Sequence, residues 1–343
     1  MFANTSKLTN RDSSFELLRL FSQYCIVLYH ILCFFVTPNN DNVIFKALQI
    51  PLHMGVIVFV LLSGYFMIKP NSKGLIKLMG IFLVYGIPDV CAKLMMSDSI
   101  KEIGHSFMIL SNTRYWFVRT YLYLYLFAPV LNFIFKNTSV KFNWYVVCVL
   151  CFIALYMGTA GGGDSLRSGK NLANFILVYC CGNMLSRYRD KWKQINFFPI
   201  FMSFIVLNGF MITSYVFVPF EMGRKVLWHL FFPYTSPFLL LNAILVFCIF
   251  GKMNIKSPVV NYFAGSSFAI YLIHSNTCFF NEMRLLVENI GISLGYNQLL
   301  FFCAIVLFAF CVICVCVLID KILSPIWFLL NKFGTLVNRK IGV

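Results

Sequence analysis

The sequence contains few charged residues, and acidic residues are the scarcest of them. Only 12% of the 343 residues are charged, and 12 Asp and Glu stand against 28 Lys and Arg. Soluble domains contain about a quarter charged residues, so this composition excludes an ordinary soluble protein. With hydrophobic residues at 60%, the chain has instead the composition of a protein that crosses the membrane several times.

Signals for several other classes of protein are also missing. The first apolar segment has no small-residue cleavage site, so we expect it to stay in the protein as a membrane span. The histidines lie in different apolar segments without the spacing of a zinc site, so no metal is expected. The net charge of +16 would suggest nucleic acid in a soluble protein. In a membrane protein it fits basic cytoplasmic loops, so we expect no nucleic acid.

The segment GGGDSLRSGK resembles a phosphate-binding loop only superficially. Five residues separate Gly163 from Gly169, whereas the motif requires four, and Asn171 replaces its Ser or Thr. We therefore expect no nucleotide at this loop.

Ten apolar segments are long enough to span a bilayer, which takes about 20 residues. These segments are residues 15–36, 50–68, 75–96, 115–135, 142–160, 172–187, 195–218, 227–250, 258–280 and 299–322. We expect an all-α polytopic membrane protein with about ten transmembrane helices. Residues 1–343 are expected to form a single integral-membrane domain with no appended soluble domain.

The distribution of Lys and Arg predicts the orientation of these spans. If the N-terminus lies in the cytoplasm and the spans alternate, most of the 28 Lys and Arg residues fall on the cytoplasmic side. This positive-inside bias predicts that both termini are cytoplasmic.

Two ionisable residues lie in the first apolar segment, within ELLRLFSQYCIVLYH. On an α-helix Arg19 and His30 share one face, about 20° apart around the axis and about 16 Å apart along it. Glu16 lies one turn before Arg19 and can pair with it. An ionisable side chain inside the membrane usually faces a functional cavity. Alternatively, Arg19 is an interfacial arginine whose charged end extends to the membrane surface, and His30 is a buried histidine with a structural role. The arrangement suits an anionic cytoplasmic substrate whose reactive end reaches into the membrane.

Further polar residues are predicted to lie at about the same depth in the membrane as His30. His53 and Arg119 fall near the outer ends of their segments, and His274 falls in the outer half of the ninth. In SFAIYLIH, Ser267 and Tyr271 share a helix face with His274 because they lie three to four residues apart. Together these residues predict a polar cavity that opens to the outside.

Four motifs in these segments resemble the acyltransferase-3 family, the bacterial multi-pass membrane O-acyltransferases that modify cell-surface glycans. Glu16-Leu-Leu-Arg19, followed by ten residues and His30, resembles the acidic-x-x-Arg-x10-His first helix of the family. VFVLLSGYFM (58–67), WFVRTYLYLYLFAPVLN (116–132) and SFAIYLIH (267–274) are similar to three later family motifs. One departure concerns Arg114 and Arg119, which are five residues apart where some members carry Arg-x-x-Arg.

The resemblance implies a donor, acetyl-CoA in the cytoplasm, and an acceptor hydroxyl on a sugar. We expect Arg19 with Glu16 at the donor, and His30 as general base or transient acyl carrier. Arg119 or Tyr271 is expected to stabilise the oxyanion. His274 is expected to orient His30 or to bind the acceptor. Four further residues are expected to bind substrate: Trp116, Ser267, His53 and Arg114.

The expected function is O-acetylation of a capsular, exopolysaccharide or O-antigen sugar at the bacterial inner membrane. The acceptor is a lipid-linked or polymeric glycan, and acetyl-CoA acts as co-substrate with no bound cofactor. A succinyl-transferring or polymer-exporting relative fits the same residues. A polysaccharide flippase or polymerase is the alternative from another class, but it does not require the Arg19–His30 pair.

Overall fold

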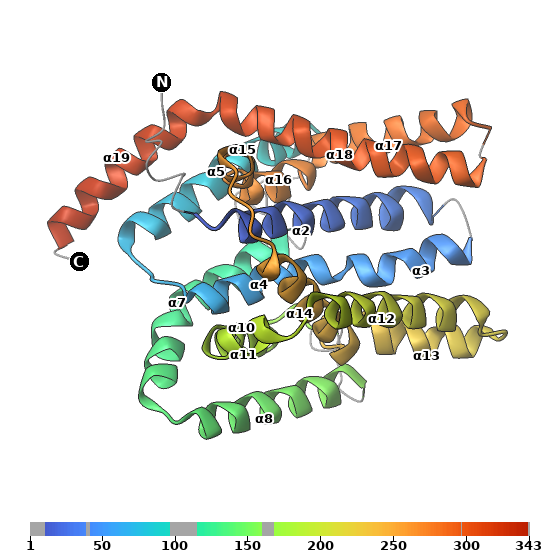
Figure 1. The fold of residues 1–343 in the computed structure, drawn as a ribbon. Coiled ribbons are helices and arrows are strands. Elements are labelled where there is room, and N and C mark those ends of the chain that lie inside the picture. The colour runs from blue at the N-terminus through green and yellow to red at the C-terminus, as the bar shows by residue number, and fades with distance from the viewer. Residues whose placement is uncertain (1–10, 39–41, 97–114, 160–167, 296, 342–343) are drawn as a thin grey trace. The chain divides into compact units, whose positions relative to one another are not determined.

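The computed structural model describes residues 11–38, 42–96, 115–159, 168–295 and 297–341. Every regular element in these ranges is a helix (Figure 1). Six helical stretches among them are long and apolar enough to cross a membrane. They are Ser13–Val36, Val43–Phe66, Ser72–Cys91, Trp116–Asn137, Phe197–Phe217 and Gln298–Ile322, and Val140–Tyr156 and Pro237–Lys252 are shorter apolar helices. The all-α, multi-span class is thereby confirmed, whereas the count of ten and the cytoplasmic termini remain predictions.

The chain forms two compact units. Unit 1 comprises Met1–Ile68 and Val130–Ala264, and unit 2 comprises Lys69–Pro129 and Gly265–Val343. The helices of unit 1 are α2 (Ser13–Ile31), the π-helix η1 (Leu32–Val36), α3 (Val43–Leu52), α4 (Met54–Phe66), α8 (Val140–Thr159), α10 (Leu172–Arg187), α11 (Arg189–Gln194), α12 (Phe197–Phe217), α13 (Glu221–Phe231), α14 (Pro237–Lys252) and α15 (Pro258–Ala264). Those of unit 2 are α5 (Ser72–Met96), α16 (Ser267–His274), α17 (Thr277–Ser293), α18 (Gln298–Ile322) and α19 (Ser324–Ile341), and α7 (Trp116–Asn137) begins in unit 2 and ends in unit 1. The single integral-membrane domain remains a prediction.

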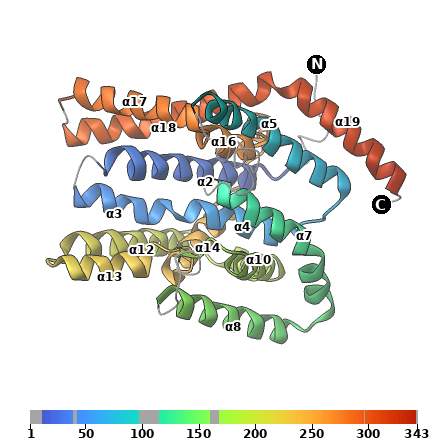
Figure 2. The ribbon, with the colours of Figure 1, turned by 180° about the vertical axis from the view of Figure 1, so that it is seen from behind.

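Helix α2 begins where the sequence supplies a cap. The Asp12 carboxylate accepts a hydrogen bond from the Ser14 amide at 3.2 Å, and Glu16 places a negative charge in the first turn, where the helix dipole favours it. At its other end α2 continues directly into η1, and the Thr37 amide donates to the Leu32 carbonyl at 2.9 Å. In unit 1, α2, α3 and α12 lie side by side (Figures 1 and 2).

Helices α4 and α10 cross at two glycines. A Cβ atom on Gly64 would lie 2.1 Å from the Tyr179 carbonyl oxygen, and one on Gly182 would lie 2.2 Å from the Leu61 carbonyl oxygen. Small residues allow membrane helices to approach this closely. Gly64 belongs to the second motif, VFVLLSGYFM, so this motif has a packing role in addition to any role in function.

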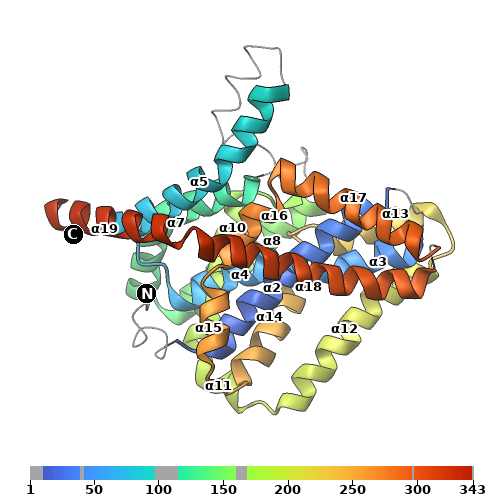
Figure 3. The ribbon, with the colours of Figure 1, turned by 90° about the horizontal axis from the view of Figure 1, so that it is seen from above.

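A buried carboxyl group organises unit 2. Asp320 of α18 accepts hydrogen bonds from the Tyr85 hydroxyl (2.8 Å), the Ser266 hydroxyl (2.6 Å) and the Trp327 indole nitrogen (3.0 Å). These donors come from α5, the residue before α16 and α19, so one side chain joins four segments. Helices α17 and α18 run antiparallel beside each other (Figures 1 and 3).

Some predicted segments are not single helices; residues 50–68, for example, include the end of α3 and all of α4, which are separated at His53. Residues 227–250 are divided between α13 and α14, because α14 starts at Pro237 and the Ser236 hydroxyl caps it through the Leu239 amide. Residues 258–280 are divided among α15, α16 and α17, and the Asn276 side chain caps α17 through the Cys278 amide. The expectation of one uninterrupted helix in each place was wrong.

Candidate active site

Glu16 and Arg19 form the ion pair that their spacing predicts. The Arg19 guanidinium donates to both Glu16 carboxylate oxygens, at 3.0 and 3.1 Å. Glu16 is buried and also lies 3.7 Å from Arg11. Two arginines therefore share one carboxylate at the N-terminal end of α2.

His30 lies on the same unbroken α-helix as Arg19, which confirms the helical relation predicted from the sequence. Its side chain is half-buried, and its ring lies 5.6 Å from the ring of Phe34 and 5.4 Å from that of Tyr29. The π-helix η1 starts two residues later, at Leu32. Such π-segments are frequent at functional sites in helices.

His53 is enclosed by aromatic rings of unit 1. It stacks on Phe232 (4.2 Å between ring centroids) and Tyr234 (4.0 Å), and Tyr29 lies 4.8 Å away. His53 Nδ1 lies 2.7 Å from the Phe232 carbonyl oxygen, so this nitrogen carries the proton and donates it. Through Tyr29, the structure brings His53 and the His30 end of α2 into one cluster.

The last residues of the GGGDSLRSGK segment, 168–170, lie in this part of unit 1. Gly169 has a positive φ of +72°, and the Asn174 side chain donates to its carbonyl (3.2 Å) and to that of Tyr234 (3.1 Å). A Cβ atom on Gly169 would lie 2.9 Å from the Thr235 amide nitrogen. This glycine therefore has a structural role: it lets the turn pack against the Tyr234 loop.

In unit 2 the third and fourth motifs meet. The ring of Phe117 on α7 lies 5.3 Å from that of Tyr271 on α16. Ser267, Tyr271 and His274 all lie on α16 and are buried. His274 has no exposed surface, and its Nδ1 donates to the Ile270 carbonyl at 2.6 Å.

The N-terminal turn of α7 carries two of the predicted residues. Trp116 and Arg119 are both half-buried and lie three residues apart on this helix. The Thr120 hydroxyl donates to the Trp116 carbonyl at 2.9 Å. Arg114, predicted to bind substrate, lies outside the described residues.

Two groups of residues were missed by the sequence reasoning. The first is a pair of buried carboxyl groups in unit 2, Asp89 and Asp320. Asp89 accepts hydrogen bonds from the Tyr115 hydroxyl and from the Thr277 amide (2.6 Å), so it holds the start of α17 just after His274. Among the described residues, no three His, Cys, Asp or Glu side chains come together as a metal site.

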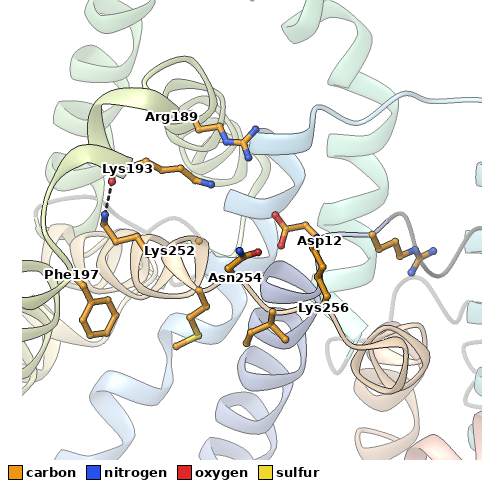
Figure 4. Close-up of a pocket in the computed structure, with 11 residues that line it drawn as sticks. Asp12, Arg189, Lys193, Phe197, Lys252, Asn254 and Lys256 are labelled. Carbon is orange, nitrogen blue, oxygen red and sulfur yellow. Dashed lines mark hydrogen bonds between the residues drawn. The ribbon is translucent and has the colours of Figure 1, made fainter.

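The second missed group surrounds a pocket in unit 1 (Figure 4). The pocket has a volume of about 970 Å³ and lies beside the N-terminal end of α2. Its lining combines five cations with one carboxylate: Arg11, Arg189, Lys193, Lys252, Lys256 and Asp12. The sequence signal was present as clusters of Lys and Arg near residues 189 and 252, which positive-inside loops also explain.

A comparison with protein families identifies the family of the chain. The acyltransferase-3 family model, described as an acyltransferase domain, matches residues 12–321. No curated protein and no solved structure matches the chain. The matched range includes the Arg19–His30 helix, the glycine-packed α4, the start of α7 and α16. The chain belongs to the acyltransferase-3 family and is a membrane acyltransferase.

Proposed function

We propose that this acyltransferase moves an acetyl group from cytoplasmic acetyl-CoA to a hydroxyl of a cell-surface glycan. One observation supports the proposal most directly. Helix α2 carries the Glu16–Arg19 pair next to a cationic pocket at one end and half-buried His30 at the other. The helical rise separates Arg19 from His30 by about 16 Å, a distance that an extended acyl-carrying arm can follow along the helix.

His30 is the proposed general base. It removes the proton from the sugar hydroxyl while the oxygen attacks the thioester carbonyl. The tetrahedral intermediate then expels CoA as a thiolate, which takes up a proton, and the products are the acetylated sugar and CoA. In the two-step alternative the His30 ring nitrogen attacks the thioester carbonyl, the carbon–sulfur bond breaks and CoA leaves as a thiolate. The sugar hydroxyl then attacks the acetyl-histidine, its proton is released and His30 is regenerated.

The roles proposed for unit 2 rest on its motifs and on its own geometry. Arg119 or Tyr271 is proposed to stabilise the oxyanion, and His274, Trp116 and Ser267 are proposed to bind the acceptor. The Phe117–Tyr271 contact supports this grouping because it joins the two motif helices within unit 2. His53 is proposed to shape the wall near His30, since its ring is enclosed by aromatic neighbours.

The location and the acceptor complete the proposal. The chain is proposed to lie in the bacterial inner membrane, with its donor side in the cytoplasm, and to act on a lipid-linked or polymeric glycan of the capsule, exopolysaccharide or O-antigen. Transfer of a succinyl group from succinyl-CoA is the variant compatible with the same residues.

The test is the O-acetyl content of the surface glycan of the host, measured by proton NMR before and after mild base. A deletion strain and the same strain complemented with the wild-type gene are compared. We expect a base-labile acetyl signal that is lost on deletion and restored on complementation. A change in glycan amount or chain length with constant acetylation would contradict the proposal and favour a flippase or polymerase.

A further inference from the structure

The cationic pocket of unit 1 is built from three separate parts of the chain. They are the start of α2, helix α11 with the first residue of α12, and the segment that follows α14. Figure 4 shows the side chains of Arg189 and Lys193 extending toward Asp12 and Asn254 across the pocket. All the residues that line the pocket belong to unit 1.

The walls of the pocket are held by specific contacts. The Ser14 hydroxyl donates to the Met253 carbonyl at 2.5 Å and accepts from the Ile255 amide at 3.1 Å. The Ser257 amide donates to the Ser13 hydroxyl at 2.9 Å. These bonds tie the segment after α14 to the start of α2. The cations on both elements are thus held around one space by the fold.

The positive charge of the pocket is not neutralised by the residues around it. Among the described residues, Arg189, Lys193, Lys252 and Lys256 form no ion pair with a carboxylate. The one acidic lining residue, Asp12, is engaged in capping α2. The Lys252 ammonium donates to the Lys193 carbonyl at 2.6 Å, which keeps these two residues together. An excess of fixed cations in a concave site favours a ligand with several negative charges.

The neighbouring arginines point to the same conclusion. Arg19 shares its charge with buried Glu16, and Arg11 lies 3.7 Å from that carboxylate while also lining the pocket. The excess positive charge therefore lies in the pocket, on α11, at the end of α14 and in the segment that follows it, beside the start of the helix that carries Arg19. In addition, α12 begins at Phe197 on the pocket wall without a side-chain cap, and helix N-termini favour phosphate.

We infer that this pocket binds the phosphate groups at the nucleotide end of the acyl-CoA donor. The inference rests on the proposed function, and it assigns donor recognition to Arg189, Lys193, Lys252 and Lys256 in addition to Arg19. The acyl arm then leaves the pocket at Arg11 and Glu16 and follows α2 toward His30.

The experiment measures binding separately from acyl transfer. The probe is adenosine 3′,5′-bisphosphate, which carries phosphates but no acyl arm, and the full chain is purified into nanodiscs of phosphatidylcholine. Wild type is compared with the double variant Arg189→Gln/Lys193→Gln. The matched control is Lys191→Gln, an exposed lysine on the same helix α11 that does not line the pocket.

We expect the double variant to weaken binding of the bisphosphate about tenfold or more, and the control to leave it unchanged. Binding to wild type should also weaken with added salt more steeply than binding to the double variant. In transfer assays the KM for acetyl-CoA should rise with little change in kcat. If the double variant does not fold, the exposed Lys256→Gln provides the same comparison with a smaller expected effect.

Equal affinities of wild type and the double variant would overturn the inference. Failure of the bisphosphate to bind would overturn it, and pocket-dependent binding of phosphatidylglycerol in a second set of nanodiscs that contain this lipid would assign the pocket to a lipid headgroup instead. Wild-type binding of the bisphosphate without any transfer from acetyl-CoA would support the phosphate site and contradict the proposed function instead. The two claims therefore fail separately.

Discussion

At the scale of single residues, three buried acidic side chains each have a defined structural task. Glu16 joins two arginines at the start of α2, Asp89 holds the start of α17, and Asp320 accepts three hydrogen bonds. The Glu16–Arg19 pair was predictable because its partners lie one helical turn apart. The partners of Asp320 were not, since they come from segments far away in the sequence and only the fold brings them together.

Replacement of Asp320 tests this reading of the buried carboxyl group. Asp320→Ala leaves the donors of Tyr85, Ser266 and Trp327 without their buried acceptor. We therefore expect the free energy of unfolding to fall by about 3 kcal/mol or more. The readout is the thermal unfolding midpoint of the protein in detergent. Asp190→Ala, at an exposed aspartate, is the control and should leave the midpoint unchanged. A wild-type midpoint for Asp320→Ala would show that these hydrogen bonds do not stabilise unit 2.

At the scale of helices, apolar length predicted most elements and failed where polar residues interrupt them. The expected helix over 299–322 is observed as α18, but that over 258–280 is three helices. Hydropathy averages over the Ser and Asn residues that cap the new helices, so it misses such breaks. The crossing of α4 and α10 was also unpredicted, because Gly64 in the motif does not reveal its partner Gly182.

The glycine crossing leads to a second prediction. Gly64→Ala or Gly182→Ala should force α4 and α10 apart, because the new methyl group would overlap backbone atoms of the facing helix. We expect a loss of about 1–3 kcal/mol, seen as a lower unfolding midpoint in detergent. Gly209→Ala is the matched control: it lies inside α12 with nothing within 4 Å of the added carbon, and alanine favours the helix. Equal midpoints for all three variants would refute the close-packing account.

At the scale of the whole molecule, composition and the order of motifs were enough to predict the fold class and the family. The family match over residues 12–321 confirms that part. The division into two units and the cationic pocket were not predicted. Both depend on contacts between distant segments, such as that of Ser14 with Met253, which single-sequence patterns do not contain. The same lysines and arginines that set the expected orientation also line the pocket.

The central claim is that His30 performs acetyl transfer from acetyl-CoA to the glycan. The most direct measurement uses membrane vesicles with an exposed cytoplasmic face, given radiolabelled acetyl-CoA, and counts base-labile acetyl groups on the glycan. Wild type is compared with His30→Gln at equal abundance in the membrane. We predict incorporation by wild type and a loss of about 10²-fold or more in the variant, the amount typical of general base catalysis. Equal incorporation by both proteins would contradict the account and leave His30 with a structural role.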